Sequence, residues 1–344
     1  MGILFLLEGL FMMKYRKLST EPSDINTALV LSGGGAKGAY QVGVVKQLYE
    51  MGISFDLISG TSIGALNGAL MSEFIHRGLS SQEMCIRLEK AWLGFQKFLS
   101  INWSGFLRNI LCPSKIPSVY TNKYIKKTLY KYIPANRRFS DYTKCQLSVT
   151  GTNLSCRELE IFDFNSTTPV VEAVLASMSY PVAYPAVDID GDIFIDGGAL
   201  SNAPLKEAIQ WGARNIYLVF LRPLKLEKGK ILDAGEDYSA LEVVGEFLDM
   251  AANRLMYGDL KRAEQINQVI NLLNKYQHRL PKNFVREMRQ LYGLKYKGGK
   301  RVIEIKQISP GKVLIPPGLR GFKQKNAIKD IIKKGQEDTK AVFL

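Results

Sequence analysis

Two successive segments of the chain each read as a short buried strand, a glycine turn and a helix. Residues 27–32 form an apolar run that ends at the glycines of 33–35, and residues 36–50 follow with apolar side chains at helical spacing. The pattern repeats when residues 55–59 lead through a second glycine turn into an apolar, small-residue-rich segment over 63–74. This repeated order predicts a mainly parallel sheet covered by helices on both faces.

Later segments continue this alternation and then change in character. Further strands are expected at 146–150, 159–164, 192–196 and 215–221, and further helices at 169–179 and 204–211. Beyond Pro223 come a polar, lysine-rich stretch, one or two long amphipathic helices over 240–273, a last strand over 302–308 and a basic tail. We therefore expect a leader over 1–26, a three-layer α/β/α domain over 27–222 and a mostly helical C-terminal extension over 223–344.

The chain is strongly basic, with 46 Lys and Arg against 32 Asp and Glu and a formal net charge of +14. Such a balance favours anionic partners, either nucleic acid or an acidic membrane surface. No helix-turn-helix, stacking platform or zinc pattern accompanies the charge, so we expect no nucleic-acid partner. The four cysteines show no Cys-x-x-Cys spacing and only two histidines are present, so we expect reduced thiols and no metal site.

Residues 1–13 form an apolar run at the N-terminus. A helix needs about 20 residues to span a bilayer, and the basic residues here follow the run, whereas those of a secretory signal precede it. We interpret the run as a frayed terminal segment or an over-extended start, with a membrane anchor as the alternative. The expected location is cytoplasmic or peripheral at a membrane, and secretion without a standard signal peptide stays open.

Ser62 lies in Gly60-Thr61-Ser62-Ile63-Gly64, where the second strand is expected to turn into the second helix. A tight turn there would project the Ser62 hydroxyl from the sheet edge, and Gly60 and Gly64 would keep Cβ atoms away from neighbouring backbone. The start of the helix would direct free N–H groups and a positive dipole end at the same point. The pattern predicts that Ser62 is an acylating nucleophile, and the alternative is an ordinary tight turn.

A second glycine-rich segment follows the first strand. It consists of Gly33, Gly34, Gly35, Ala36, Lys37 and Gly38. Successive glycines let several backbone N–H groups point at one spot, which suits an oxyanion hole, where each donor can lower a barrier by about 3 kcal/mol. The segment also matches the Gly-x-Gly-x-x-Gly of dinucleotide-binding loops. That motif requires an acidic residue at the end of the second strand, where this chain has Gly60-Thr61-Ser62.

A serine nucleophile needs a base. The order Ser62, Asp196, His278 formally fits a triad, but His278 lies in a polar helical end, and His76 lies at the far end of the helix that follows Ser62. Asp196 instead ends an apolar strand and is followed by Gly197-Gly198, where backbone can approach closely. Three competing carboxylates look solvated along a hairpin around Gly191. They are Asp188, Asp190 and Asp192.

These segments together resemble the patatin-like phospholipases. The glycine-rich segment, the Ser62 turn and Asp196-Gly197-Gly198 occur in the family's order, and two further blocks agree. One is Ala176-Ser-Met-Ser-Tyr-Pro181-Val-Ala-Tyr-Pro185, and the other is Asn202-Ala203-Pro204. The resemblance covers residues 27–222 and implies a patatin-like fold for that part of the chain.

The resemblance implies a Ser–Asp dyad in place of a triad. Asp196 would accept the Ser62 proton, the glycine-rich segment would hold the oxyanion, and water would release a fatty acid from an acyl-enzyme. The substrate would be a phospholipid or other lipid ester, cleaved as by a phospholipase A or lysophospholipase, with no metal or organic cofactor. Lys37 stands where many relatives carry Arg, and lysine keeps the charge but lacks the planar fork.

Several alternatives stay open at this point. The chain could be a catalytically idle lipid-binding or regulatory relative, or an esterase that depends on His278. The tail over 320–334 places lysines around an isoleucine and phenylalanine stripe, which suits either an interfacial helix on anionic lipid or a helix docked on the core. The aromatic residues of 92–142 suit either a lid or acyl pocket or ordinary core packing.

Overall fold

The computed structural model describes residues 25–95, 98, 118–224, 240–276, 278–291, 302–314, 322 and 324–344. Residues 1–24 of the predicted leader lie outside these ranges. So do most of the lysine-rich stretch after Pro223, Cys112 and the aromatic residues Trp103 and Phe106.

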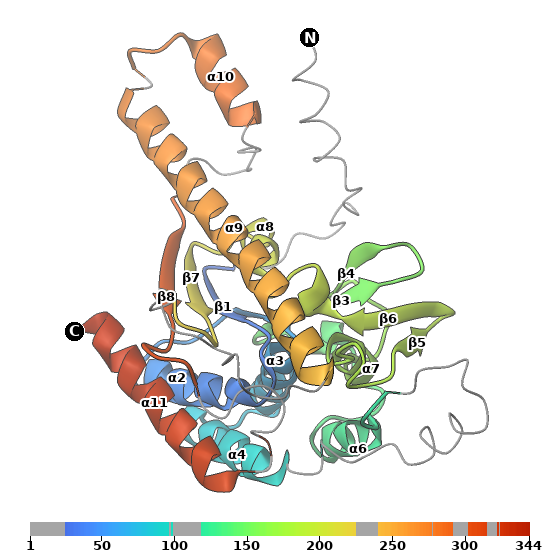
Figure 1. Ribbon diagram of the computed structural model, residues 1–344. Coiled ribbons are helices and arrows are strands. Elements are labelled where there is room, and N and C mark those ends of the chain that lie inside the picture. The colour runs from blue at the N-terminus through green and yellow to red at the C-terminus, as the bar shows by residue number, and fades with distance from the viewer. Residues whose placement is uncertain are drawn as a thin grey trace, which may run out of the picture.

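Within the described part of the chain, one mixed sheet forms the centre of the molecule (Figure 1). Its strands are β1 (Thr27–Leu31), β2 (Leu57–Thr61), β3 (Gln146–Asn153), β4 (Glu158–Phe162), β5 (Val187–Ile189), β6 (Asp192–Asp196), β7 (Asn215–Val219) and β8 (Glu304–Ile308). They follow the order β5-β6-β3-β2-β1-β7-β8, with β4 also paired to β3. The neighbouring pairs β3–β2, β2–β1, β1–β7 and β7–β8 are parallel. The pairs β3–β4, β3–β6 and β5–β6 are antiparallel. The expected mainly parallel sheet is confirmed.

The described helices, in chain order and with η for a 3-10 helix, are η1 (Gly35–Gly38), α2 (Ala39–Glu50), α3 (Ile63–His76), α4 (Ser81–Gly94), α6 (Lys123–Tyr132), η3 (Phe139–Asp141), α7 (Val170–Ser177), η4 (Gly197–Ala199), α8 (Leu205–Gln210), α9 (Ala240–Tyr276), α10 (Lys282–Leu291) and α11 (Lys325–Phe343).

Both faces of the central strands are buried, which gives three layers. In β1, Leu29 and Leu31 pack into one apolar cluster with α2, α3, α4, α7 and α11. Ala28 and Val30, which point to the opposite face, pack into a second cluster with α8 and α9. Alternating side chains of a strand point to opposite faces, so the continuous apolar run read from the sequence corresponds to a strand covered on both sides. The three-layer α/β/α arrangement is confirmed.

The C-terminal part joins the same sheet. Strand β8 pairs with β7 in parallel, and α9 forms one uninterrupted helix that runs across the molecule and continues past the sheet (Figure 1). Helix α11 packs on α2, and the backbones approach closely where Gly43 faces Gly335. Ile328, Ile331 and Ile332 are buried there. The tail is therefore a docked helix, and the interfacial interpretation of its isoleucine stripe is wrong.

The described aromatic side chains at the end of α4 and just after it belong to the core. Trp92, Phe95 and Phe98 are fully buried and pack with Phe322. The described part of these aromatic residues therefore supports core packing over a lid.

Three of the cysteines are described and are free thiols, with Cys85 and Cys145 buried and Cys156 exposed. Among the described residues no cluster of potential metal ligands occurs. No helix within the described ranges is both long and apolar enough to cross a membrane.

Candidate active site

The turn after β2 holds Ser62 in a strained conformation. Ser62 is the N-cap of α3 and has φ 56° and ψ −120°, a region that non-glycine residues enter rarely and at a cost of about 1–3 kcal/mol. The Ser62 N–H donates to Ser177 Oγ at 2.8 Å, which holds the turn from the end of α7. A sharp strand-to-helix turn of this kind presents the side chain of its central residue for reaction.

Two glycines make this turn sterically possible. A Cβ atom at Gly60 would collide with the Gly64 carbonyl, and a Cβ atom at Gly64 would collide with the carbonyl of Leu31 in β1. Both obstacles are backbone atoms, which cannot move aside without shifting α3 or β1. The steric reason given for these glycines from the sequence is confirmed.

Ser62 and Asp196 meet although they are 134 residues apart in the chain. Ser62 Oγ donates to Asp196 Oδ2 at 2.5 Å, and the second oxygen, Oδ1, accepts from the Gly198 N–H at 2.8 Å. Asp196 is only 3% exposed, while Ser62 is partly open to solvent. Short O–H···O⁻ hydrogen bonds are among the strong ones in proteins, so the carboxylate is well placed to accept the serine proton.

Strand register explains this meeting. Thr61 of β2 lies opposite Thr150 of β3, and the next residue of β3, Gly151, lies opposite Asp196 of β6. The ends of β2 and β6 therefore lie on either side of β3, one residue apart in its register. The Asp196 backbone is held further by its N–H, which donates to the Ser179 carbonyl at 3.0 Å.

The glycine-rich segment faces Ser62 from the end of β1. A Cβ atom at Gly33 would lie 3.2 Å from Ser62 Cβ, so this loop is in contact with the serine. The Gly33 N–H donates to the Asn202 carbonyl at 3.0 Å and is already used. Gly34 and Gly35 have φ of 153° and 59°, and their N–H groups precede the first intrahelical bond of η1, where N–H groups stay available for a ligand. Gly33 therefore drops out of the predicted set of oxyanion donors, and the remaining candidates are Gly34, Gly35 and the residues just after them.

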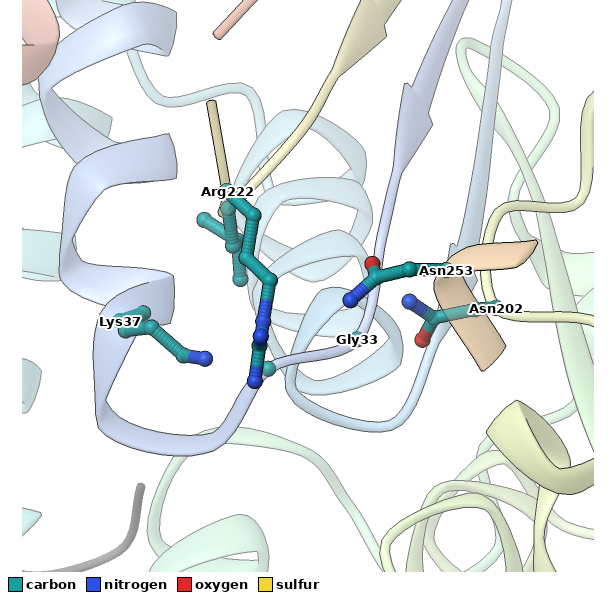
Figure 2. Close-up of a pocket in the computed structure, with 7 residues that line it drawn as sticks. Gly33, Lys37, Asn202, Arg222 and Asn253 are labelled. Atoms are coloured by element: carbon teal, nitrogen blue, oxygen red, sulfur yellow. The ribbon is translucent and has the colours of Figure 1, made fainter. Parts of the chain in front are cut away.

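Lys37 lines a small pocket beside this loop. The pocket is bordered by Gly33, Gly34, Lys37, Asn202, Leu221, Arg222 and Asn253. Figure 2 shows the polar ends of Lys37, Arg222, Asn202 and Asn253 reaching into one common space beside Gly33. Lys37 is only 3% exposed, so its side chain stays beside the glycine-rich segment and does not extend into solvent.

Both histidines lie away from this cluster. His76 ends α3, about 21 Å along the helix from Ser62 at 1.5 Å per residue, and its ring packs edge-on against Tyr142. His278 is exposed just beyond the end of α9. The N-terminal half of α9 is the half near the site, because the hydroxyl of Tyr180, which follows Ser179 in the chain, donates to the Gly245 carbonyl. Tyr276, at the His278 end of α9, lies about 45 Å further along the helix.

The three competing carboxylates, Asp188, Asp190 and Asp192, are all exposed along the β5–β6 hairpin, as expected from the sequence.

Comparison with known proteins agrees with these motifs. The family model described as patatin-like phospholipase matches residues 29–209, more than half of the 344 residues. This chain belongs to the patatin-like phospholipase family.

Individual relatives match over the same region. Patatin-like phospholipase domain-containing protein 6 of Mus musculus is 27% identical over 199 residues, which is 56% of this chain and 13% of that protein. Lysophospholipase nte1 of Aspergillus terreus is 30% identical over 205 residues, 60% of this chain and 12% of that protein. The chain thus corresponds to about an eighth of the length of these relatives. Among solved structures, VipD from Legionella pneumophila aligns with a TM-score of 0.46 and 15% identity, covering 98% of this chain and 72% of that one.

The family motifs of this chain are brought together, and other residues join them that sequence reasoning did not single out. Ser177 and Ser179 lie within a block quoted for the family resemblance, so their position could have marked them. Asn202 lies in another such block, and its side chain packs between the Gly33 loop and Gly198. Arg222 and Asn253 lie outside every motif, and no local pattern distinguishes them from surface residues.

Proposed function

We propose that this chain is a serine-dependent lipid acyl hydrolase of the phospholipase A or lysophospholipase type. The observation that carries the proposal is the 2.5 Å contact between Ser62 Oγ and Asp196 Oδ2 beside a glycine loop with available N–H groups. The names of the family and of its relatives, which include lysophospholipases, support a fatty acyl ester as the substrate class.

In the first half of the reaction, Ser62 Oγ attacks the ester carbonyl carbon while its proton passes to Asp196 Oδ2. The negative charge that develops on the carbonyl oxygen is held by the Gly34 and Gly35 N–H groups, each contributing about 3 kcal/mol to the barrier reduction. When the tetrahedral intermediate collapses, Asp196 returns the proton to the leaving alkoxide. The lipid alcohol departs and the acyl group stays on Ser62.

In the second half, water takes the place of the departed alcohol. Asp196 accepts a proton from this water as the oxygen attacks the acyl carbonyl, and it then returns the proton to Ser62 as the fatty acid leaves. Gly198 holds the carboxylate through Oδ1 and leaves Oδ2 directed at the reaction centre. Every step uses groups of this chain and water, so the proposal requires no cofactor.

We also propose that the protein works at an anionic membrane surface, because a lipid substrate lies in a bilayer and the chain carries a net charge of +14. Helix α9 supports this through Val243, Phe247 and Met250, which share one helical face and are 50%, 67% and 65% exposed. Their half of α9 contacts Tyr180 next to the site. Co-sedimentation with anionic and with neutral vesicles tests this, and equal binding to both would contradict it.

The central experiment combines active-site labelling with product analysis. A fluorophosphonate probe should label the native protein at Ser62, and mass spectrometry of a defined phospholipid mixture should show released fatty acid. Ser62→Ala should abolish labelling, and Asp196→Asn should lower hydrolysis on the order of a thousandfold or more, because it removes the base.

Two control variants separate this proposal from its alternatives. Asp192→Asn alters an exposed carboxylate on the same strand as Asp196 and should keep hydrolysis near the native rate. His278→Ala should also keep it, and a large loss there would show that the base is a histidine. If the native protein is not labelled while a reference serine hydrolase is, the chain is an idle relative.

A further inference from the structure

Thr61 of β2 and Thr150 of β3 connect the strand that ends at Ser62 with the strand beside it. The two threonines are register partners in the parallel β2–β3 pair, so their side chains lie on the same face of the sheet. Both are fully buried, and their hydroxyl oxygens lie 2.7 Å apart. Thr61 directly precedes Ser62, so the contacts that fix its side chain also fix the peptide that leads into the turn.

The direction of these hydrogen bonds follows from the number of protons. A threonine hydroxyl has one proton to donate and two lone pairs that accept. Thr61 Oγ1 donates its proton to the Ser201 carbonyl at 3.0 Å, because a carbonyl oxygen can only accept. The proton between the two threonines must therefore come from Thr150. The result is a directed chain from Thr150 through Thr61 to Ser201.

This chain ends on the turn that follows Asp196. The Ser201 N–H donates to the Gly197 carbonyl at 2.8 Å, which closes the turn on itself. Thr152, two residues after Thr150 and on the same face of β3, donates its hydroxyl proton to the Asp196 carbonyl at 3.0 Å. The segment from Asp196 to Ser201 is thus held at both of its ends by threonine hydroxyls of β2 and β3.

The middle of the turn lies directly on Thr150. A Cβ atom at Gly197 would lie 2.5 Å from both the carbonyl oxygen and Oγ1 of Thr150, so the Gly197 backbone is in close contact with β3. Gly198, the next residue, donates its N–H to Asp196 Oδ1 at 2.8 Å. A shift of the turn away from β3 would therefore move this donor, and the carboxylate that it holds would lose its place beside Ser62.

A second pair of hydroxyls on the same two strands makes no such bridge. Ser59 and Ser148 are also register partners, two residues before Thr61 and Thr150, and both are fully buried. Their Oγ atoms have no hydrogen-bond partner within the described part of the chain. Burial on β2 and β3 is therefore common to both pairs, whereas the bond to the turn after Asp196 belongs to the threonine pair.

We propose that Thr61 and Thr150 are positioning residues, whose hydroxyl chain holds the turn after Asp196 at the distance that lets Ser62 Oγ reach Asp196 Oδ2. The effect on catalysis rests on the proposed function. The two hydroxyls bond to each other and to the Ser201 carbonyl, so they act through the turn and not on the substrate. A misplacement of about 1 Å at a reacting pair can lower a rate on the order of a hundredfold.

The first test measures kcat and KM for one lysophospholipid in mixed micelles, at a temperature where circular dichroism shows every variant to be folded. Thr61→Val keeps the β-branched shape and removes the hydroxyl. It should lower kcat by about ten- to a hundredfold and leave KM within about twofold of the native value. Thr61→Ser restores the hydroxyl and should keep kcat within about threefold of native. A raised KM with native kcat in Thr61→Val would overturn the proposal.

Thr150→Val gives an independent reading, also where Thr61→Val does not fold. It should lower kcat in the same direction but less strongly, because the bond from Thr61 to Ser201 remains. Since Thr150 acts through the Thr61 hydroxyl, adding Thr150→Val to Thr61→Val should change kcat by less than about twofold. Losses that multiply in the double variant would show that the two residues act separately, which contradicts the chain.

The matched control is Ser148→Ala, which deletes a buried hydroxyl from the same face of β3 two residues before Thr150. It should leave kcat near the native value, because Ser148 Oγ has no bond to lose among the described residues. An equal fall of kcat in Thr61→Val and Ser148→Ala would show that any hydroxyl lost from these strands has this effect, and the proposal would be wrong.

Amide hydrogen exchange, followed by NMR, reads the position of the turn without any substrate. Thr61→Val should speed exchange at Gly198 and Ser201 about tenfold relative to Leu29 at the centre of β1, because the turn opens more easily. Thr61→Ser and Ser148→Ala should leave this ratio unchanged. Equal acceleration at all three amides would show a global loss of stability and would contradict a role in the turn.

The failure of this inference is distinguishable from failure of the proposed function. If the threonines do not position the turn, the native protein still cleaves the ester, and Thr61→Val changes neither kcat nor the exchange ratio. If the proposed function fails, the native protein cleaves no ester, and the exchange experiment still decides whether the threonine chain holds the turn.

Discussion

We expect the free energy of unfolding to depend on pH through one buried carboxyl group, that of Glu207. It lies on α8, is 2% exposed, and its Oε2 has no hydrogen-bond partner among the described residues. Burial raises the pKa of its carboxyl group from the ordinary value of 4.5 to about 7, with Lys206 opposing the shift and Asp259 adding to it. The folded state therefore binds a proton here more tightly than the unfolded state does.

The sign and size of the effect follow from proton linkage. Because the folded-state pKa is the higher one, the stabilising contribution is fully present below pH 4.5 and is lost as the pH rises through about 7. A shift from 4.5 to about 7 corresponds to about 3 kcal/mol over the whole range. Between about pH 5 and about pH 8 the expected loss from this group is about 2.5 kcal/mol.

The perturbation is Glu207→Gln, which keeps the shape of the side chain and removes its titration. Urea unfolding of both proteins at about pH 5 and about pH 8 gives four free energies of unfolding. The native protein should lose about 2.5 kcal/mol more than the variant between the two pH values, whatever the amide does to stability at either one. If both proteins lose the same free energy, Glu207 does not carry a raised pKa, and the reasoning from burial is refuted.

Three further substitutions test the packing that positions the site. Gly64→Ala places a Cβ atom against the Leu31 carbonyl and should lower the free energy of unfolding by about 1–3 kcal/mol. Probe labelling of Ser62 should fall as well, and unchanged labelling would show that the turn tolerates the methyl group. Ser177→Ala removes the acceptor of the Ser62 N–H and should cost about 1–3 kcal/mol in urea unfolding, and a neutral effect would mean that water replaces the hydroxyl. Gly335→Val pushes α11 away from the backbone of α2 and should lower Tm and hydrogen-exchange protection in both helices, whereas a loss confined to α11 would contradict their close packing.

Local patterns determined much of the fold. The apolar runs before the two glycine turns and the helical spacing after them specified where β1, α2, β2 and α3 lie, because short-range periodicity and glycine turns act within a few residues. The hairpin of β5 and β6 and the long helix α9 followed from equally local signals. Local sequence could not decide whether the isoleucines of α11 pack on the core or lie on a membrane, since a stripe of apolar side chains suits both equally well.

The sequence by itself determined that Ser62 stands at a strained turn and that Asp196 ends a strand before two glycines. Only the tertiary structure decided that these two side chains meet, because β6 pairs antiparallel with β3 in a register that brings Asp196 beside the end of β2. It also decided that the Gly33 N–H is already engaged by Asn202 and that Arg222 and Asn253 join Lys37 in one pocket. Contacts between residues this far apart depend on strand order and on how α9 crosses the sheet, and no pattern within a few neighbouring residues encodes them.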